Sequence, residues 1–421
     1  MPHTDPLDPR PALTSVDALT VLSVLRRRPD VEAPELVAVD AADRLVLAEA
    51  AGLLAAAGPG DVAVLDDAYG ALTIGALALG APDVRVHTDA VTGERALVAN
   101  LSDVATVARA SASDGAGAHD LHRAPARVHV HPALTPEVVA GARVVLVRLP
   151  RALDALAQIT DLIADHAAPD VVLLATGRLK HMSRSMNDVL GVRFDDVHAT
   201  LARGKSRALV ARTPRAAATP GPGFPRTARH DDVGLTVVAH GAAFAGTSLD
   251  IGTRFLLRHL DAVAADLEAA SAGEGDGPAA LDLGCGTGIL ATALARAVPH
   301  ATVTATDRSA AAVASAAGTA AANGVGDRVV VLRDDVAASV PDARVDVVVC
   351  NPPFHAGAAL STDIASAMFR AAARVLRPGG VLWTVYNTPL RYRAELGRVV
   401  GPTAHVGQNP KFTVTRSVRR A

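Results

Sequence analysis

Short apolar runs alternate with helical segments throughout the second half of the chain, and this alternation constrains the fold more than any other feature. The runs are continuous in Val, Leu and Ala, which is typical of parallel strands buried on both faces. Two further candidates near the C-terminus, TAHVG and KFTVTRSV, are close enough to form an antiparallel hairpin. We therefore predict an α/β fold with a doubly wound, mainly parallel sheet that ends in this hairpin. The expected parallel strands are 279–284, 302–307, 328–335, 345–351 and 380–387.

The first half of the chain repeats this plan in altered form. Residues 62–79 align with the segment that begins LDLGCGTG, but only Gly70 matches a turn glycine, and Arg148 stands where the second copy has Asn351. A repeat this long indicates duplicated domains, and we expect the first copy to be degenerate and structural rather than catalytic. The expected boundaries are a first domain at 1–212, a Pro- and Gly-rich linker at 213–230 and a second domain at 231–421.

Charge, cysteine content and hydropathy exclude several classes of protein. A net charge of −2 creates no global field that attracts nucleic acid, so local basic clusters would have to hold a polyanion. Cys285 and Cys350 are too few for a disulfide framework or a four-ligand zinc site, and we expect no metal. No apolar run approaches the roughly 20 residues that span a bilayer, and the N-terminus lacks a secretory pattern. We expect a cytoplasmic monomer that does not associate with membranes.

The motif LDLGCGTG closes one expected strand and opens a helix. Gly284, Gly286 and Gly288 allow a tight turn whose backbone can approach a ligand closely. A dinucleotide fingerprint would read G-x-G-x-x-G, whereas this loop is G-x-G-x-G, which favours a ligand without a pyrophosphate. A strand-to-helix turn without any ligand is the plainer alternative. We assign the three glycines, together with Asp282 of the same motif, to a cofactor pocket.

Two carboxylates follow at the ends of neighbouring strands. Asp307 is placed to accept hydrogen bonds from both hydroxyls of a ribose, and Asp335 is placed to accept one from an adenine amino group. Either residue alone could simply cap a helix. In combination with the glycine loop they indicate a nucleoside that carries an amino-acid tail and no phosphate, which is S-adenosylmethionine.

The stretch VVVCNPPFH, residues 347–355, ends a buried strand on an amide and two prolines. With the glycine loop, Asp307 and Asp335, it resembles class I S-adenosylmethionine-dependent methyltransferases that act on planar or amide nitrogens. The segments AFAGTSLDIGTRFLLRHL, MFRAA and PKFTV extend the resemblance to the bacterial ribosomal-RNA guanine-N2 methyltransferases, which have two tandem methyltransferase-like domains. LDIG, PKFTV and KHMSRS look most like the large-subunit 23S branch. The resemblance covers nearly the whole chain, most strongly from Gly241 onward.

This resemblance implies a catalytic role for Asn351, Pro352 and Phe354. The side-chain carbonyl of Asn351 and the backbone carbonyl of Pro352 would accept the two N–H bonds of guanine N2, which directs its lone pair toward the incoming methyl group. The prolines hold these acceptors rigidly. Stacking of the base on Phe354 would contribute roughly 1–3 kcal/mol. No strong general base is needed, and positioning supplies most of the acceleration.

The resemblance also assigns residues around this centre. Asp250 and Gly252 of LDIG, together with Asn351, would border the cofactor, although Asp250 could act only as a helix N-cap. Contact with the target nucleotide is expected on the other side; for His355 a capping role is the alternative. Phosphate contacts from the first domain would help to hold the RNA. The residues expected to contact substrate are Pro353, Phe354, His355, Lys411 and Phe412 in the second domain, and Arg178, Lys180, Arg184 and Lys205 in the first.

Two alternatives remain open at this point. The NPPF chemistry also suits adenine N6 or a glutamine amide of a protein, although the duplicated domain and the LDIG and PKFTV segments argue against both. A non-catalytic RNA-binding factor of ribosome assembly would be expected to have a damaged cofactor loop in the second copy. That loop is intact in the sequence.

Overall fold

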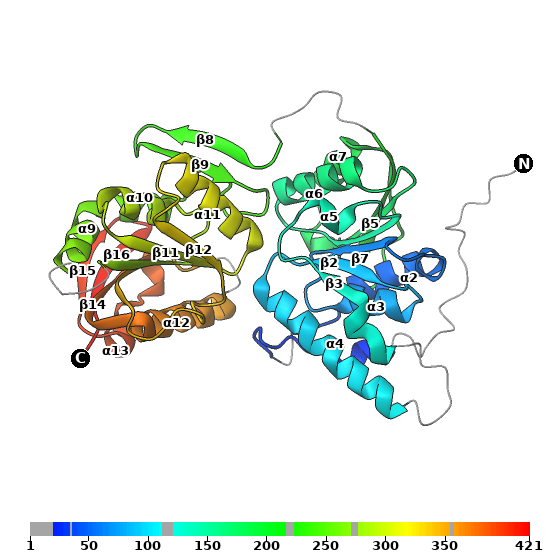
Figure 1. Ribbon diagram of the computed structural model, residues 1–421, viewed down its shortest axis with the longest axis horizontal. Helices are drawn as coiled ribbons and strands as arrows, with labels where there is room; N and C mark the ends of the chain where they lie inside the picture. Colours follow the sequence, from blue (N-terminus) through cyan, green and yellow to red (C-terminus); the bar gives the residue numbers. More distant parts are fainter. Residues whose placement is uncertain (1–19, 34–35, 112–120, 216–222, 271–276, 354–357) are drawn as a thin grey trace, which may run out of the picture. The chain divides into compact units, whose positions relative to one another are not determined.

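The structure is a computed structural model that describes residues 20–33, 36–111, 121–215, 223–270, 277–353 and 358–421. The chain divides into two compact units, Met1–Gly223 and Phe224–Ala421 (Figure 1). Phe354 and His355, which the sequence assigns to the substrate, lie outside the described residues.

The described part of the first unit forms a seven-stranded sheet with the order β3-β2-β1-β4-β5-β7-β6. Strands β1 to β5 are parallel, and β6 and β7 form an antiparallel hairpin at one edge. The strands are β1 (Val62–Leu65), β2 (Val84–His87), β3 (Val128–Val130), β4 (Val144–Arg148), β5 (Val172–Arg178), β6 (Phe194–Ala199) and β7 (Ser206–Pro214). The helices are η1 (Val21–Val24), α2 (Ala41–Ala55), α3 (Ala71–Ala78), α4 (Val91–Ser111), η3 (Leu121–Arg127), α5 (Pro136–Val139), α6 (Leu153–His166), η4 (Leu179–His181) and α7 (Arg184–Gly191).

The second unit repeats the same topology, with the strand order β12-β11-β10-β13-β14-β16-β15 in its described residues. The predicted doubly wound sheet with a C-terminal antiparallel hairpin is therefore confirmed in both units. The strands are β10 (Ala279–Leu283), β11 (Thr302–Asp307), β12 (Val329–Arg333), β13 (Val345–Cys350), β14 (Leu376–Asn387), β15 (Thr403–Gln408) and β16 (Phe412–Val418). The helices are α8 (Ile251–Leu257), α9 (Leu260–Ala269), α10 (Ile289–Ala297), α11 (Ala310–Ala322), α12 (Ala358–Val375), η6 (Thr388–Leu390) and α13 (Arg393–Val399).

A separate hairpin precedes the second sheet, in a region where the sequence predicted part of the linker. Strand β8 (Arg226–His230) pairs with β9 (Leu235–Ala239), and the end of β7 also falls within the predicted range 213–230. The other edge of β9 and the residue after it are hydrogen-bonded by side chains of α11 and its C-cap, namely Ser315, Thr319 and Asn323. The Pro- and Gly-rich composition of this region did not predict strands. The partners that stabilise β9 lie some 80 residues away in the sequence and cannot be seen in local composition.

The two faces of the second sheet bury different side chains, which fixes the direction of the residues at the strand ends. Val347, Val349, Trp383 and Val385 pack in one cluster with helices α8 to α11, whereas Val348, Leu382 and Tyr386 pack on the other face with α12 and α13 (Figure 1). Side chains alternate between faces along a strand. The strand ends of β13 and β14 therefore present Asn351 and Asn387 on the α8 face. Among the described helices, none is both long and apolar enough to cross a membrane.

Candidate active site

Asn351 follows the last residue of β13, and its side-chain amide is held in one orientation. Its Nδ2 donates hydrogen bonds of 3.0 Å to Asp250 Oδ2 and 3.0 Å to Thr253 Oγ1. A carboxylate can only accept hydrogen bonds, so the amide must turn its nitrogen toward Asp250. The Oδ1 atom is buried and has no hydrogen-bond partner among the described residues. The site thus holds an oriented acceptor that no described residue satisfies.

Asp250 connects this amide to the start of helix α8. It is the N-cap of the helix, and the oxygen that accepts from Asn351 also accepts from the backbone N–H of Thr253 at 3.1 Å. The N-cap alternative for Asp250 is therefore confirmed, and the same residue also orients Asn351. Its contact with a cofactor stays a prediction.

Gly252 brings three parts of the chain together. A Cβ atom at this position would lie 3.0 Å from Asp250 Oδ2, 3.1 Å from a ring carbon of Phe412 and 3.2 Å from Asn351 Oδ1. Phe412 begins β16 and is buried, so its ring borders the free oxygen of Asn351. Next along the chain from Asn351, Pro352 is buried and Pro353 is exposed. The stacking role of Phe354 is untested, because that residue is not described.

The glycine loop between β10 and α10 shows two different requirements for glycine. Gly288 has φ +73° and caps α10, and a Cβ there would approach Ala316 Cα of α11 to 2.7 Å. Close packing of the loop against α11 therefore explains this glycine. Gly286 has φ +53°, and a Cβ there would meet nothing within 4 Å. The space beside Gly286 is open to a ligand, and Gly284 completes the turn with φ +78°.

The carboxylates of the predicted pocket lie at the carboxyl ends of β11 and β12. Asp307 Oδ2 accepts from the backbone N–H of Gly286 at 3.0 Å, and its Oδ1 accepts from that of Ser309 at 2.9 Å. Asp307 is thus fixed directly against the open glycine. Asp335 is half-buried, two residues beyond the end of β12, while its neighbour Asp334 is buried and accepts hydrogen bonds from Ser339.

Asp282 lies inside the sheet rather than at its edge. Its side chain is 1% exposed, and Oδ2 accepts a 2.9 Å hydrogen bond from the backbone N–H of Ala291 in α10. Burial raises the pKa of this carboxyl to about 7, and the nearby charge of Asp307 acts in the same direction. Asp282 therefore anchors the helix that follows the glycine loop. The predicted contact between Asp282 and a cofactor remains untested.

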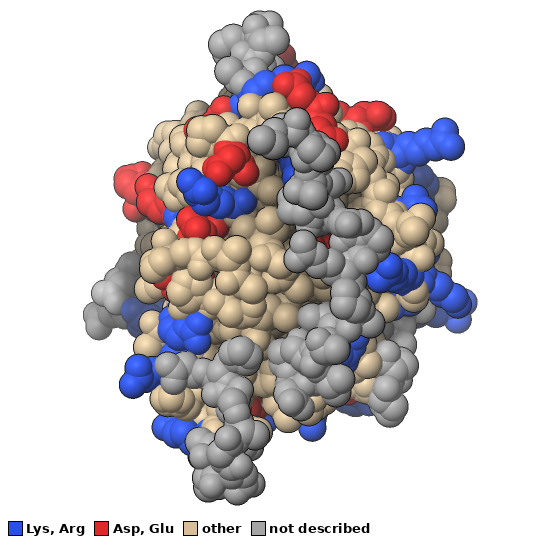
Figure 2. Space-filling view, turned by 90° about the vertical axis from the view of Figure 1, so that its right-hand side faces the viewer, with Lys and Arg blue, Asp and Glu red and all other residues tan. Residues whose placement is uncertain are grey.

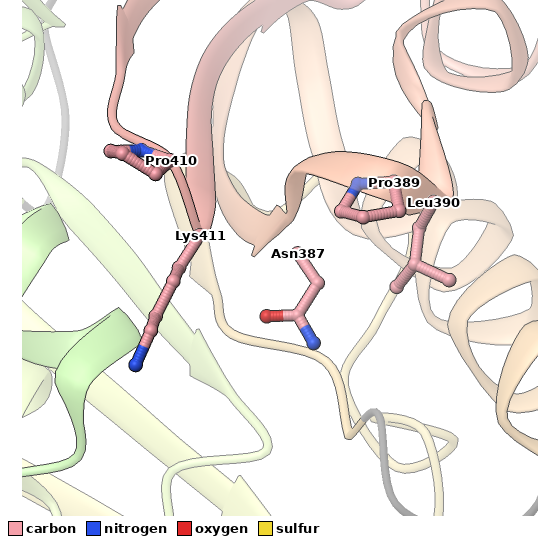
Figure 3. A pocket seen from close by; sticks show the side chains of 5 residues that line it. All are labelled: Asn387, Pro389, Leu390, Pro410 and Lys411. Carbon is pink, nitrogen blue, oxygen red and sulfur yellow. The ribbon is translucent and has the colours of Figure 1, made fainter.

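A cavity of about 370 Å³ opens at the carboxyl end of β14. It is lined by Asn387, Pro389 and Leu390 at the end of β14 and in η6, and by Pro410 and Lys411 in the turn before β16 (Figure 3). Lys411 was assigned to the substrate from sequence, and it lines this cavity. Asn387 was missed, although a polar residue that ends a parallel strand is the same signal that identified Asp307.

The basic residues of the first unit that the sequence assigns to RNA lie near the carboxyl end of β5. Arg178 ends β5, and the backbone N–H of Leu179 donates to the carbonyl of Lys205 in the β6–β7 turn at 3.0 Å, so Arg178 and Lys205 lie close together. Lys180 lies in η4, and Arg184 begins α7. His181 is exposed, and slight desolvation, followed by the charges of Arg151, Lys180 and Arg178, lowers its pKa. On the face drawn in Figure 2, Lys and Arg side chains stand in small groups rather than in one continuous field.

Comparison with known proteins agrees with this architecture. A family described as RLMG N-terminal domain matches residues 18–215, and one described as Methyltransferase small domain matches residues 234–416. Ribosomal RNA large subunit methyltransferase G of Pseudomonas aeruginosa is 34% identical over 404 residues, which cover 93% of this chain and 96% of that protein. The protein of the same name from Streptomyces coelicolor is 37% identical over 281 residues, which cover 66% of this chain and 72% of that protein.

A solved structure shares the fold over nearly the whole chain. It is the T. thermophilus 16S rRNA N2 methyltransferase RsmC in complex with AdoMet and guanosine, with a TM-score of 0.66 and 23% sequence identity, and the match covers 90% of this chain and 92% of that one. Two tandem methyltransferase folds, an intact glycine loop and an oriented amide in the second unit, and relatives that match over almost their full length lead to one conclusion. This chain belongs to the family of ribosomal RNA large subunit methyltransferase G.

Proposed function

We propose that this protein transfers a methyl group from S-adenosylmethionine to the exocyclic N2 of one guanine in large-subunit, 23S ribosomal RNA. One observation carries the proposal: the buried Oδ1 of Asn351 has no hydrogen-bond partner in the described structure. An unsatisfied buried acceptor costs on the order of 1–3 kcal/mol. An N–H group of a bound substrate would remove that cost.

The chemistry follows from what this acceptor does to an aromatic amine. The lone pair of guanine N2 is delocalised into the ring, which makes the nitrogen a poor nucleophile. Asn351 Oδ1 and the backbone carbonyl of Pro352 would each accept one of its N–H bonds and turn the lone pair out of the ring. Both acceptors also stabilise the positive charge that develops on the nitrogen. Asp250 and Thr253 keep the Asn351 oxygen pointed at the amine throughout.

The residues present fit S-adenosylmethionine, which when bound supplies an electrophilic methyl group. Gly286 leaves open space at a positive φ, and Asp307 is fixed beside it to accept hydrogen bonds from ribose hydroxyls. Asp335 is placed at the next strand end for the adenine amino group, and Asp250 and Gly252 border the transfer centre. This open loop favours an enzyme over a non-catalytic scaffold.

The first unit would hold RNA through phosphate contacts, and the target base would leave its stack to reach Asn351. Four of its basic residues have no ion pair with a carboxylate in the described part of the chain, so their charges are available to phosphates; they are Arg178, Lys180, Arg184 and Lys205. Such contacts position an RNA without reading its sequence.

The test uses purified protein, S-adenosylmethionine with a labelled methyl group, and two substrates: deproteinised 23S RNA and assembled large subunits from cells that lack the protein. Mass analysis of the nucleosides distinguishes N2-methylguanosine from N6-methyladenosine, and mass analysis of peptides from the ribosomal proteins detects a methylated glutamine. We expect N2-methylguanosine from one of the two substrates. Asn351→Ala should lower kcat by roughly 10²- to 10³-fold, as loss of one preorganised polar contact does. A different methylated product, or full activity of Asn351→Ala, refutes the proposal.

A further inference from the structure

Asn387 is a second side-chain amide at the edge of the same sheet. It is the last residue of β14, it is half-buried, and its side chain makes no hydrogen bond with any described residue. Figure 3 shows the amide directed into the cavity between Lys411 and Leu390. A carboxamide carries one acceptor and one donor side by side, and both are available here.

The sheet places this amide next to Asn351. Strands β13 and β14 are parallel neighbours, with Val349 opposite Trp383 and Cys350 opposite Thr384. Asn387 therefore lies one strand across and two residues beyond Asn351 on the same face, a Cα separation of roughly 8 Å from standard strand geometry. Two side chains whose Cα atoms are this far apart, and which project from the same face, can both contact one planar base.

Phe412 gives a second, independent indication that the amides of Asn387 and Asn351 lie close together. It is paired directly with Asn387 across β14 and β16, and side chains of such a pair project from the same face. The ring of Phe412 and Asn351 Oδ1 both reach the space above Gly252. Phe412 therefore lies beside both amides. The cavity beside Asn387 has a volume of about 370 Å³, which lies in the range of small-molecule sites.

We propose that Asn387 selects the target base by reading its N1 and O6 positions while Asn351 holds N2; this inference rests on the proposed function. Guanine presents the N2 amine, the N1–H donor and the O6 acceptor in a row along one edge. The acceptor of Asn387 matches N1–H, and its donor matches O6. Asn387 is thus a specificity residue of the same site. Pyrimidines lack this row of groups.

The experiment compares two bases that both carry the N2 amine. An RNA fragment that contains the mapped target guanine is prepared also with 2-aminopurine at that position, which lacks O6 and the N1–H. The ratio of kcat/KM for guanine to that for 2-aminopurine is measured for the wild type, Asn387→Ala and Asn387→Leu. The Leu variant keeps the branched shape of the side chain without hydrogen-bonding groups. We expect this ratio to fall by about 10- to 100-fold in both variants, the usual value of one bidentate base contact.

Gly397→Ala is the control, because Gly397 lies in α13 and does not line the cavity, and an added Cβ there would meet nothing within 4 Å. Its ratio should stay within about twofold of the wild type, since no base contact is lost. If the wild type makes N2-methylguanosine but both Asn387 variants keep the wild-type ratio, the reading role of Asn387 is wrong and the proposed function stands. If the wild type makes no N2-methylguanosine, both are overturned.

Discussion

The side-chain nitrogen of Asn351 lies 3.0 Å from Asp250, the residue that caps helix α8. The first unit contains the corresponding pair: Arg148 ends β4 and donates a 2.9 Å hydrogen bond to Asp40, the N-cap of α2. Arg148 also donates to the buried Asp43. The two units thus share a contact between strand end and helix cap, but a guanidinium has no acceptor to offer an amine, whereas the Asn351 amide does.

The two units also differ at the first glycine of the loop. Asp66 stands where the second unit has Gly284, and both residues have positive φ, +58° and +78°. Burial first, and then the neighbouring Asp89, raises the pKa of Asp66 to about 7. The first unit thus carries an ionisable side chain where the second has glycine, at which a Cβ would lie 2.9 Å from Met368 Cε.

Removal of the Asp250 carboxylate should disable catalysis through Asn351. In Asp250→Ala the amide is no longer forced into one orientation, and we expect kcat to fall by about 10²-fold, the scale of a small misplacement. Loss of the cap should also cost about 1 kcal/mol in the free energy of unfolding. Single-turnover methyl transfer measures the first effect.

Ser309→Ala is the matched control for that variant. Ser309 caps α11 by accepting from the backbone N–H of Ala312 at 3.1 Å, and it makes no contact with Asn351 in the described structure. Denaturation followed by Trp383, the single tryptophan of the chain, reports unfolding of the second unit. Both variants should lose similar stability, but only Asp250→Ala should lose activity. Equal activities would contradict the orienting role.

Gly252→Ala should lower methyl transfer more than it lowers stability. The added Cβ would press on Asp250, Phe412 and Asn351 Oδ1, all within 3.2 Å, and displace the acceptor from the amine. Overpacking of this kind typically costs about 1–3 kcal/mol. Gly397→Ala in α13 is the control: its Cβ meets nothing within 4 Å, so the variant should gain about 0.5–1 kcal/mol and keep its activity. A fully active Gly252→Ala enzyme would exclude this tight packing.

Asp282→Asn should flatten the pH dependence of stability in the second unit. The pKa of Asp282 is about 7 in the folded protein and 3.8 for an ordinary Asp. Between these values the folded state keeps a proton that the unfolded state has lost, so the free energy of unfolding falls as pH rises from about 4 to 7. Asparagine does not ionise, and its oxygen can still accept from Ala291.

Urea titrations at pH 4, 5.5 and 7.5, followed by Trp383 fluorescence, compare the wild type with Asp282→Asn. The difference between the two free energies should grow with pH, on the order of a few kcal/mol in favour of the variant above pH 7. Parallel pH profiles would show that Asp282 keeps an ordinary pKa in the folded protein.

Lys205→Asn should make the protein more stable and a weaker RNA binder. Gly204 and Lys205 have φ of +56° and +59° and form the two-residue turn between Arg203 and Ser206, a geometry that disfavours lysine. Asn tolerates positive φ, so stability should rise by a few tenths to about 1 kcal/mol. Loss of one phosphate contact should weaken RNA binding and reduce the salt slope by about one.

Filter-binding titrations of Lys205→Asn across a salt series give both quantities. Lys205→Gly serves as the partner variant, because it also relieves the turn and removes the charge but brings no new side chain. If both variants bind RNA with the wild-type affinity and salt slope, the turn makes no contact with phosphate. The predicted increase in stability, which comes from relief of backbone strain at residue 205, does not depend on that outcome.

Local patterns in the sequence were sufficient for the fold. Continuous Val-rich runs, turn glycines and a polar residue at each strand end follow from short-range rules. They predicted both sheets, the turn from Gly284 to Gly288 and the positions of Asp307 and Asn351 at strand ends. The family resemblance added the expected chemistry of Asn351 and Pro352. The sequence did not indicate β8 at the end of the predicted linker 213–230, because this strand depends on pairing with β9. Strand β9 is in turn stabilised by side chains of α11 far away in the chain.

Only the tertiary structure decided which way the site's atoms point. Asp250 fixes the Asn351 amide across 101 residues of sequence. Gly252 packs closely against Phe412 at the start of β16 and Asn351 after the end of β13. Asn387 shares a sheet face with Asn351. The orientation of an amide depends on the donors and acceptors that surround it, and those neighbours come together only when strands and helices pack. Sequence spacing names the residues at the sheet edge, but packing determines which of their oxygens is left for the substrate.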